Sequence, residues 1–513
     1  MTPYSHTILT HLHTPLHTHT HLHTPLHTHT TTTNRSHVCW HVYGLLHRAD
    51  RNYLEAIKAY KQALRIDQDN LQILRDLSLL QIQMRDLAGF VITRNSILNL
   101  KPTAQTNWLS FAVSKQLQNN YDGALQVIDI YLGTLTPGKS VELTRDYQPS
   151  ELQMYKSYLL LKSGNAQEAL THLETVKGIV MDRGAWLWHK SNCQFALREY
   201  DNARKTILTL LQRGATEDYR VHAAYQCAVL EIRKTDEQQF MGMDTLATTR
   251  VLTSDQKQLL LQLYRNDLKE EFTKSAAVQR IPLTLLEGTA LETALQTYIR
   301  KRLLKGVPSL AVDLGSLCLQ EIEGRYSRVS DPLDFKHHAT YKLLCKMCKD
   351  YIDNLQTINK FSKDDADEQE PSTIFWAFFL MAGLLELAGD YDESLVMLTK
   401  CLDHTPTAVD VYEVQARVLQ KSGDSSMAVD AIDKGRDLDQ QDRYMNNQTT
   451  LFLLQANMPE AALAKIGLFT NNDEHTSPDE TLYDMQCSWY ELELADCLAR
   501  QENYGKSLKK YGT

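Results

Sequence analysis

The stretch SHVCWHVYGLLHRADRNYLEAIKAYKQALRIDQDNLQILRDLSLLQIQMRDLAGF (36–90) contains one order of large and small residues twice, 34 residues apart. The copies run large, large, small along a first segment and then aromatic or leucine, small, large along a second, with Ser78 and Phe90 as departures in the second copy. This order is typical of the tetratricopeptide repeat (TPR), in which a small residue on each of two helices lets them approach closely. A third copy follows, and the equivalent positions are Trp40, Leu74 and Trp108; Tyr43, Leu77 and Phe111; Gly44, Ser78 and Ala112; Tyr53, Leu87 and Tyr121; Ala56, Phe90 and Ala124; and Leu64, Leu98 and Leu132.

The same step of 34 residues returns near the other end of the chain. It links Gly389 with Gly423; Tyr391 with Ser425 and Pro459; Ser394 with Ala428 and Ala462; and Leu398 with Ile432 and Ile466. Helix pairs that contact only their neighbours stack into a solenoid. We therefore predict an all-α fold, a right-handed α-solenoid of TPR helix pairs. Ala56 and Ala124 should be buried where the two helices of a pair meet.

Composition shifts and the quality of the repeat divide the chain into predicted segments. These are a low-complexity His/Thr tract (1–35), a TPR array of three units (36–134), a loop (135–150), degenerate TPR-like helices (151–235), an irregular helical region (236–362), an acidic linker (363–372), a second TPR array (373–470), a second loop (471–480) and an incomplete TPR unit (481–513).

Composition narrows the class of protein further. The chain has 513 residues, 43% of them hydrophobic, with 54 Lys and Arg against 63 Asp and Glu, for a formal charge of −9. That balance argues against a protein that coats nucleic acid, although a local basic patch stays open. No apolar run reaches the roughly 18–20 residues that a bilayer span needs. The nine scattered cysteines do not form a disulfide framework, so we expect a reducing compartment.

One stretch matches a nucleotide-binding motif. GTLTPGKS (133–140) satisfies the P-loop pattern, but a P-loop needs a strand before it and a helix after it. Here the preceding residues, 121–132, occupy the second helix of a TPR unit. We interpret Lys139 as a solvated loop lysine.

Two histidine-containing segments raise the question of metal binding. Residues 11–20 read HLHTPLHTHT, residues 21–30 repeat them, and alternating imidazoles can share a divalent ion. We favour a disordered low-complexity tail, because alternating His and Thr cannot build a packed core. The second segment joins Cys345 and Cys348 to His337 and His338, although a strong zinc signal has two such cysteine pairs. Helical periodicity places these cysteines near an apolar face, so core packing is the preferred interpretation and no metal site is predicted.

The acetyl-CoA loop of acetyltransferases, [RQ]-x-x-G-x-[GA], is also missing. It begins at Gln239 and at Gln420 but fails at its last position, which Asp244 and Ser425 occupy. We therefore predict no catalytic residues and no enzymatic activity for this chain.

The 36–90 stretch closely resembles the auxiliary, ribosome-anchoring TPR subunit of the N-terminal acetyltransferase A (NatA) complex. DNLQILRDLSLLQIQMRDL (69–87) is its most diagnostic part, because generic TPR packing does not demand most of it. Weaker similarity continues in RIPLTLLEG (280–288) and DMQCSWYELELADC (484–497), so that the resemblance spans about residues 36–511. Family members extend beyond this chain at both ends, which suggests a partial chain.

The resemblance implies a non-catalytic scaffold. Such a subunit binds and shapes a GCN5-related catalytic subunit and anchors it to the ribosome in the cytoplasm, with acetyl-CoA held only by that partner. It also implies a small regulatory subunit as a further partner, no membrane contact, and inositol hexakisphosphate at the subunit interface. Gln415, Gln420 and Gln448 stand where further basic residues are expected, and the cations in the corresponding region are Arg417, Lys421, Lys434, Arg436 and Arg443.

The alternative is a generic TPR adaptor, such as a chaperone cofactor or an assembly scaffold. A carboxylate-clamp TPR grips the C-terminus of its partner with Lys and Asn side chains, and here only Asn107 and Lys115 suggest one.

A basic stretch, Arg300, Lys301, Arg302 and Lys305, has two interpretations. It is either a solvated helix end that the helix dipole favours or a contact with ribosomal RNA.

Overall fold

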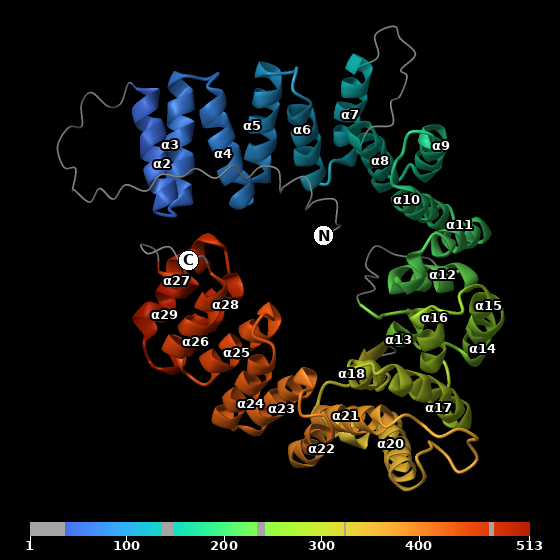
Figure 1. Cartoon of the computed structure of the whole chain (residues 1–513). Coiled ribbons are helices and arrows are strands. Elements are labelled where there is room, and N and C mark those ends of the chain that lie inside the picture. Colours follow the sequence, from blue (N-terminus) through green and yellow to red (C-terminus); the bar gives the residue numbers. More distant parts are fainter. Residues whose placement is uncertain (1–35, 136–146, 233–241, 323–324, 471–476, 513) are drawn as a thin grey trace. The chain divides into compact units, whose positions relative to one another are not determined.

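The computed structural model describes residues 36–135, 147–232, 242–322, 325–470 and 477–512 (Figure 1). The chain forms two compact units, Met1–Cys193 and Gln194–Thr513, with the division inside one helix. Each unit has its own arrangement of helices. The described residues outside helices form turns, short connections and one small hairpin.

The first unit is a row of antiparallel helix pairs. The pairs are α2 (His37–Ala49) with α3 (Tyr53–Ile66), α4 (Leu71–Gln83) with α5 (Leu87–Leu100), α6 (Gln105–Leu117) with α7 (Tyr121–Leu135), and α8 (Tyr147–Lys162) with α9 (Ala166–Val176), followed by the start of α10 (Arg183–Ala196). Successive pairs from α2 to α7 begin 34 residues apart, as the repeat predicts.

The second unit begins with shorter and less regular elements. They are α11 (Tyr200–Gln212), η2 (Ala215–Glu217), α12 (Tyr219–Val229), α13 (Leu246–Thr249), α14 (Ser254–Gln262), the π-helix η3 (Leu263–Leu268), α15 (Lys269–Glu271), α16 (Ala276–Arg280), η4 (Ile281–Thr284), α17 (Gly288–Lys305), α18 (Leu310–Gly315), α19 (Pro332–His337) and α20 (Ala339–Ile358). Between α18 and α19 lies an antiparallel hairpin of β1 (Leu319–Ile322) and β2 (Arg325–Arg328), in which Leu319 pairs with Arg328.

Regular helix pairs return in the rest of the second unit. They are α21 (Ser372–Leu387) with α22 (Tyr391–His404), α23 (Val409–Ser422) with α24 (Ser425–Leu438), and α25 (Arg443–Gln455) with α26 (Pro459–Ile466); after η5 (Gly467–Phe469) and α27 (Pro478–Asp484) comes α28 (Ser488–Arg500) with α29 (Tyr504–Tyr511). Tandem helix pairs at this spacing make the fold a TPR α-solenoid.

The turn inside most pairs has one residue in the left-handed conformation, just before the second helix. Within each run of regular pairs these residues step by 34, as in Arg51, Arg85 and Asn119, in Gly164 and Arg198, and in Gly389, Gly423 and Asn457; Glu502 occupies the same place in the last pair. A side chain then caps the second helix in several pairs; Asp86, for example, accepts a hydrogen bond from the Gly89 N–H at 2.9 Å. Local interactions, the left-handed turn residue and the helix N-cap, therefore reverse the chain direction within each of these pairs.

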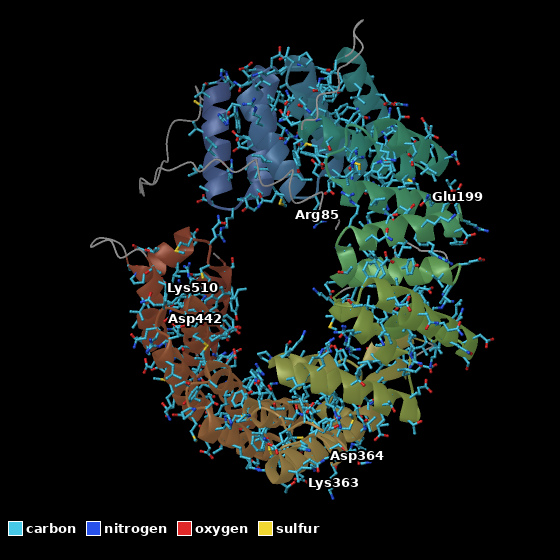
Figure 2. All side chains as sticks on the ribbon, turned by 45° about the vertical axis from the view of Figure 1, so that its right-hand side comes forward. Arg85, Glu199, Lys363, Asp364, Asp442 and Lys510 are labelled. Carbon is cyan, nitrogen blue, oxygen red and sulfur yellow. The ribbon has the colours of Figure 1, made fainter. Side chains whose placement is uncertain are left out.

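Arg85 should be a source of strain, because a left-handed residue with a Cβ costs about 1–2 kcal/mol. It has a φ of 59° and lies at the end of α4 with an exposed side chain (Figure 2). We expect Arg85→Gly to raise the free energy of unfolding by about 0.5–1 kcal/mol, net of the entropy that glycine loses on folding. Urea unfolding followed by circular dichroism measures this change. The matched control is Lys61→Gly inside α3, which should cost about 1 kcal/mol; a loss of stability in both variants would contradict the prediction.

Small residues lie where the helices of a pair approach most closely. Ala56 and Ala124 are both fully buried, which confirms the sequence prediction. Gly44 of α2 lies against the ring of Tyr60 in α3, so closely that a Cβ on Gly44 would collide with that ring. The spacing within a pair is therefore set by the small positions of the 34-residue pattern.

The largest core of the second unit is centred on α21. Residues from η4 to α23 form one apolar cluster, and most of α21 is buried around its whole circumference. A helix that is apolar on all sides is expected to lie inside a protein. Gly383 of α21 lets this helix contact α18, since a Cβ at Gly383 would collide with Ala311.

Three predicted connections differ in the structure. α8 begins at Tyr147 and α27 at Pro478, so that both predicted loops, 135–150 and 471–480, end earlier than expected. The 363–372 segment is exposed at Lys363 and Asp364 (Figure 2) but is not a free linker. Asp365 binds Arg300 at 2.9 Å, which fastens the segment to α17. The residues 1–35, which contain the His/Thr tract, lie outside the described residues.

Candidate functional site

Two of the five cations expected to bind a polyanion share one buried carboxylate. Glu386 of α21 has a side chain only 5% exposed. Its Oε1 and Oε2 accept hydrogen bonds from Arg417 Nε and Nη2 at 2.6 and 2.9 Å. Lys421 Nζ donates to Oε1 at 2.8 Å. Arg417 and Lys421 thus fasten α23 to α21.

A second carboxylate cluster holds Arg436. Asp433 accepts hydrogen bonds from Arg436 Nε at 2.7 Å and from Lys465 Nζ at 2.6 Å, and Arg436 Nη2 also contacts Asp437. Burial favours a higher pKa for Asp433, but the hydrogen bonds from Lys465 and Arg436 outweigh it and lower that pKa. Arg436 therefore has its positive charge balanced within the chain.

The remaining two predicted cations, Lys434 and Arg443, are exposed. Neither has a side-chain hydrogen bond or ion pair with another residue of the described ranges. Sequence reasoning found the five cations but missed their partners Glu386 and Asp433. Glu386 could have been found from the sequence, because it is the single acidic residue in the apolar run IFWAFFLMAGLLEL (374–387).

The Glu386 cluster predicts a pH-dependent stability. Burial favours a higher pKa for Glu386, but hydrogen bonds from Arg417 and Lys421 and their charges lower it below its ordinary 4.5. A depressed carboxylate pKa adds stability above the unfolded value and loses it as the pH falls through the folded value. At pH 7, Glu386→Gln should cost about 1–2 kcal/mol, since its partners remain partly exposed to water.

Urea unfolding from pH 7 down to pH 3.5 tests this prediction. The difference between the natural chain and Glu386→Gln should be constant at neutral pH and shrink once the pH falls below about 4.5. Glu368→Gln, at an exposed position, is the matched control and should change little. A difference that stays constant to pH 3.5 would contradict the assignment.

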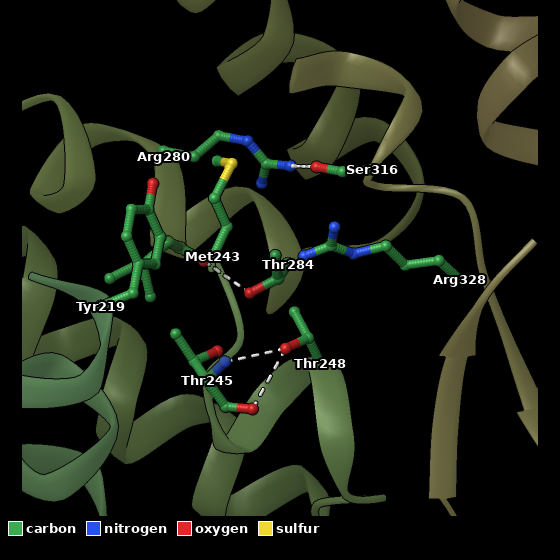
Figure 3. Close-up of a pocket in the computed structure, with 9 residues that line it drawn as sticks. Tyr219, Met243, Thr245, Thr248, Arg280, Thr284, Ser316 and Arg328 are labelled. Carbon is green, nitrogen blue, oxygen red and sulfur yellow. Dashed lines mark hydrogen bonds between the residues drawn. The ribbon is translucent and has the colours of Figure 1, made fainter. Parts of the chain in front are cut away.

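A compact polar pocket lies in the irregular part of the second unit (Figure 3). Arg280 is 3% exposed and donates from Nε to Asp313 Oδ1 at 2.6 Å. Its Nη2 donates to Ser316 Oγ at 2.7 Å, and Tyr298 donates its hydroxyl to Asp313 Oδ2 at 2.6 Å. Arg328 enters the pocket from β2 and binds Asp244 at 3.0 Å.

This pocket is too small for a ligand larger than water. Its volume is about 10 Å³, roughly the space of one water molecule. Both arginines already have carboxylate partners, so the cluster serves to fasten α16 and η4 to α18. No sequence motif pointed to this network, although Arg280 begins the RIPLTLLEG segment that carried part of the family resemblance.

The basic stretch on α17 is largely engaged within the chain. Arg300 binds Asp365 and lies 5.5 and 5.4 Å from the ring centroids of Tyr351 and Phe361. Arg302 stacks on Tyr298 at 3.2 Å. Arg300 thus faces α20 and the segment after it, whereas Arg302 stacks on a tyrosine one turn earlier in its own helix. Both guanidinium groups are engaged within the chain, and the contact with ribosomal RNA stays a prediction.

The candidate carboxylate clamp is not assembled either. Asn107 is 9% exposed and donates its Nδ2 to the Lys101 carbonyl at 2.8 Å. Lys115 lies over the Phe111 ring, 5.0 Å from its centroid. The Asn107 amide is therefore committed to the preceding turn and does not face a partner.

The metal and nucleotide motifs do not form sites in the described ranges. Cys348 is buried in α20, while His337 and His338 contact backbone carbonyls at 2.7 and 3.1 Å. Among the residues that the structure describes, no group of three or more His, Cys, Asp or Glu is arranged to hold a metal ion. The motif GTLTPGKS begins inside helix α7, at Gly133, where a P-loop requires a preceding strand; its residues 136–140 are outside the described ranges.

Within the described residues, no helix combines the length and apolar content that would let it cross a membrane.

The fold is a TPR solenoid, and most of the polar side chains described above form ion pairs or hydrogen bonds within the chain. A model of the "N-terminal acetyltransferase A, auxiliary subunit" family matches residues 147–513, and a tetratricopeptide repeat model matches residues 38–70. The chain therefore belongs to the family of NatA auxiliary subunits.

Individual relatives agree with this assignment. The chain is 36% identical over 484 residues to the N-terminal acetyltransferase A complex auxiliary subunit NAA15 of Arabidopsis thaliana, covering 93% of this chain and 49% of the relative. It is 31% identical over 479 residues to the human NatA auxiliary subunit N-alpha-acetyltransferase 16, covering 93% and 50%. The chain thus spans about half the length of these curated relatives.

A solved structure shows the same fold. A chain of the "Structure of Naa15/Naa10 bound to HypK-THB" matches with a TM-score of 0.72 and 29% identity, over 93% of this chain and 64% of that one.

Proposed function

We propose that this chain is a non-catalytic scaffold subunit that binds and shapes a GCN5-related acetyltransferase subunit and anchors it to the ribosome in the cytoplasm. The observation that carries the proposal is the likeness, in sequence and in fold, to auxiliary subunits of the NatA complex. In the matching solved structure, Naa15/Naa10 is bound to HypK-THB. By that analogy the partners here are a catalytic subunit, which holds acetyl-CoA, and a small regulatory subunit.

The architecture suits such a role. Tandem helix pairs present extended surfaces, and solenoids of this kind bind their partners along them. The polar clusters around Glu386 and Arg280 join neighbouring helices, so that the surfaces have defined positions. These internal ion pairs thus stabilise the helix positions on which a binding surface depends.

Affinity purification of the tagged full chain, followed by mass spectrometry, tests the proposal. A GCN5-related acetyltransferase should be enriched over a tag-only control and over an unrelated TPR solenoid carrying the same tag. Recovery of chaperones without an acetyltransferase would instead support the generic adaptor. The engaged Asn107 amide makes that alternative weaker.

Reconstitution separates the scaffold from the catalyst. The purified chain alone should not transfer acetyl from acetyl-CoA to a peptide that begins with Ser or Ala, whereas the chain together with the recovered acetyltransferase should. Acetyl transfer by the chain alone would overturn the scaffold assignment. Co-sedimentation of the tagged chain with ribosomes at two salt concentrations tests the anchoring role, because phosphate contacts weaken as salt rises.

Inositol hexakisphosphate stays a prediction, and the residues present fit it poorly. Arg417, Lys421 and Arg436 are ion-paired inside the chain, so that Lys434 and Arg443 are the two expected cations without a carboxylate partner among the described residues. Two exposed cations are few for so highly charged an anion. Calorimetric titration of the chain with inositol hexakisphosphate would decide the matter.

A further inference from the structure

The second unit contains an apolar cavity that side chains of the described chain do not fill. Its volume is about 370 Å³, within the range of about 300–1,000 Å³ that is usual for ligand pockets. Four separate segments form it: the residues from α13 to α14, the η4–α17 junction, the β1–β2 hairpin and the start of α20. It is open to solvent, so that a partner can enter it without unfolding the unit.

The wall of the cavity is mainly aliphatic. Leu252, Leu283, Leu286 and Leu317 line it and are themselves at most 9% exposed. An aliphatic side chain that entered would leave water and contact these leucines, at a gain of roughly 25 cal/mol per Å² of apolar surface buried. The wall therefore selects a branched or straight aliphatic group.

Most polar side chains at the edge of the cavity already form hydrogen bonds or ion pairs within the chain. Lys257 binds Glu287 at 2.6 Å. His338 Nε2 lies 3.1 Å from the Leu319 carbonyl, and its Nδ1 accepts a hydrogen bond from the Thr340 N–H at 3.2 Å. Both ring nitrogens of His338 therefore already contact backbone groups of the chain.

Three polar side chains that line the cavity have no such partner among the described residues. The exposed Arg250 guanidinium and the hydroxyls of Tyr326 and Thr340 make no side-chain hydrogen bond or ion pair with another residue of the described ranges. Among the described residues, the positive charge of Arg250 therefore has no carboxylate partner. A guanidinium binds a carboxylate with two parallel hydrogen bonds, which sets the polarity of the occupant.

We propose that this cavity binds a short peptide segment of a partner protein in which an aliphatic residue is followed by an acidic one. The aliphatic side chain contacts the leucines and the carboxylate binds Arg250. The peptide amides beside them pair with the hydroxyls of Tyr326 and Thr340, which a free aliphatic acid would leave without partners. This inference rests on the cavity alone and is independent of the scaffold role proposed above.

Three blocked hexapeptides test the proposal: GSLEGS, the neutral form GSLQGS and the form without the aliphatic residue, GSSEGS. Saturation-transfer NMR on the full chain reports contact with the leucine methyl groups, and a titration gives each dissociation constant. GSLEGS should bind about threefold to tenfold more tightly than GSLQGS, between the values of an exposed ion pair and of a charge-assisted hydrogen bond. GSSEGS should not bind measurably, because it lacks the group that fills the cavity.

Variants locate the binding. Arg250→Gln should remove the difference between GSLEGS and GSLQGS, while Arg213→Gln, at an exposed position whose side chain does not line the cavity, should leave it unchanged. Ala339 lines the cavity from an exposed position, so that Ala339→Trp should block both peptides without disturbing the core.

Three outcomes would overturn the proposal. One is that GSLEGS does not bind the natural chain, and another is that it binds Arg250→Gln as tightly as the natural chain. The third is that octanoate binds more tightly than GSLEGS with the same dependence on Arg250, because the site would then take a free aliphatic acid.

Discussion

Asp313→Asn should lower the free energy of unfolding of the second unit by about 3–5 kcal/mol. The side chain of Arg280 is 4% exposed, and its carboxylate partner is Asp313. Removing one member of a buried ion pair leaves the other charge without compensation in a medium of low dielectric constant, and costs of this size follow. Asparagine keeps the shape of the side chain, so the loss of stability is due to the missing charge and not to a cavity.

Urea unfolding, with hydrogen exchange to localise the effect to α16–α18, measures this change. The double variant Arg280→Met with Asp313→Asn should recover most of the stability, because it removes both charges while Tyr298 keeps an acceptor. Unfolding of Asp313→Asn at the same urea concentration as the natural chain would show that the pair is not buried in solution. A double variant less stable than Asp313→Asn would contradict the charge argument.

Ala124→Phe should lower the stability of the first unit by about 1–3 kcal/mol, because a large side chain would be forced into a closed helix contact. Ala124 is fully buried on α7, within a cluster that includes Ala112, Val127 and Ile128. The stability of a repeat protein is roughly the sum of the stabilities of its helix pairs and of the contacts between neighbouring pairs. The loss of stability should therefore be greatest in α6 and α7.

Hydrogen exchange of residues 105–135 with and without Ala124→Phe localises the loss. Gln126→Phe on the exposed face of the same helix is the matched control and should stay within about 0.5 kcal/mol of the natural chain. If the two phenylalanines had equal effects, the assignment of the small position in the repeat would be wrong.

Much of the fold was open to sequence reasoning because its determinants are local. The 34-residue pattern located both arrays, and the helix pairs from α2 to α7 and from α21 to α26 follow it. The irregular region was harder, because no period links its elements. The π-helix of Leu263–Leu268 and the β1–β2 hairpin lie there, and so does the cavity proposed to bind a peptide.

The candidate site was predicted only as a set of residue types. Sequence showed a group of cations in 417–443 but not that Glu386, 31 residues before Arg417, neutralises two of them. It showed a basic stretch on α17 but not that Asp365, 65 residues after Arg300, holds one of its arginines. Free and paired cations look alike in a sequence, because the pairing depends on which helices become neighbours.

The sequence by itself determined the helix pairs, their spacing and the family to which the chain is similar. Those properties depend on residues a few positions apart, such as the small residues at helix contacts, the N-caps and the left-handed turn residues. Only the tertiary structure decided which charges pair inside the fold, as with Arg280 and Asp313, and which have no ion-pair partner among the described residues, as with Arg250. The physical reason is that burial and ion pairing are set by distances across the fold, and those distances exist only after the helices have packed.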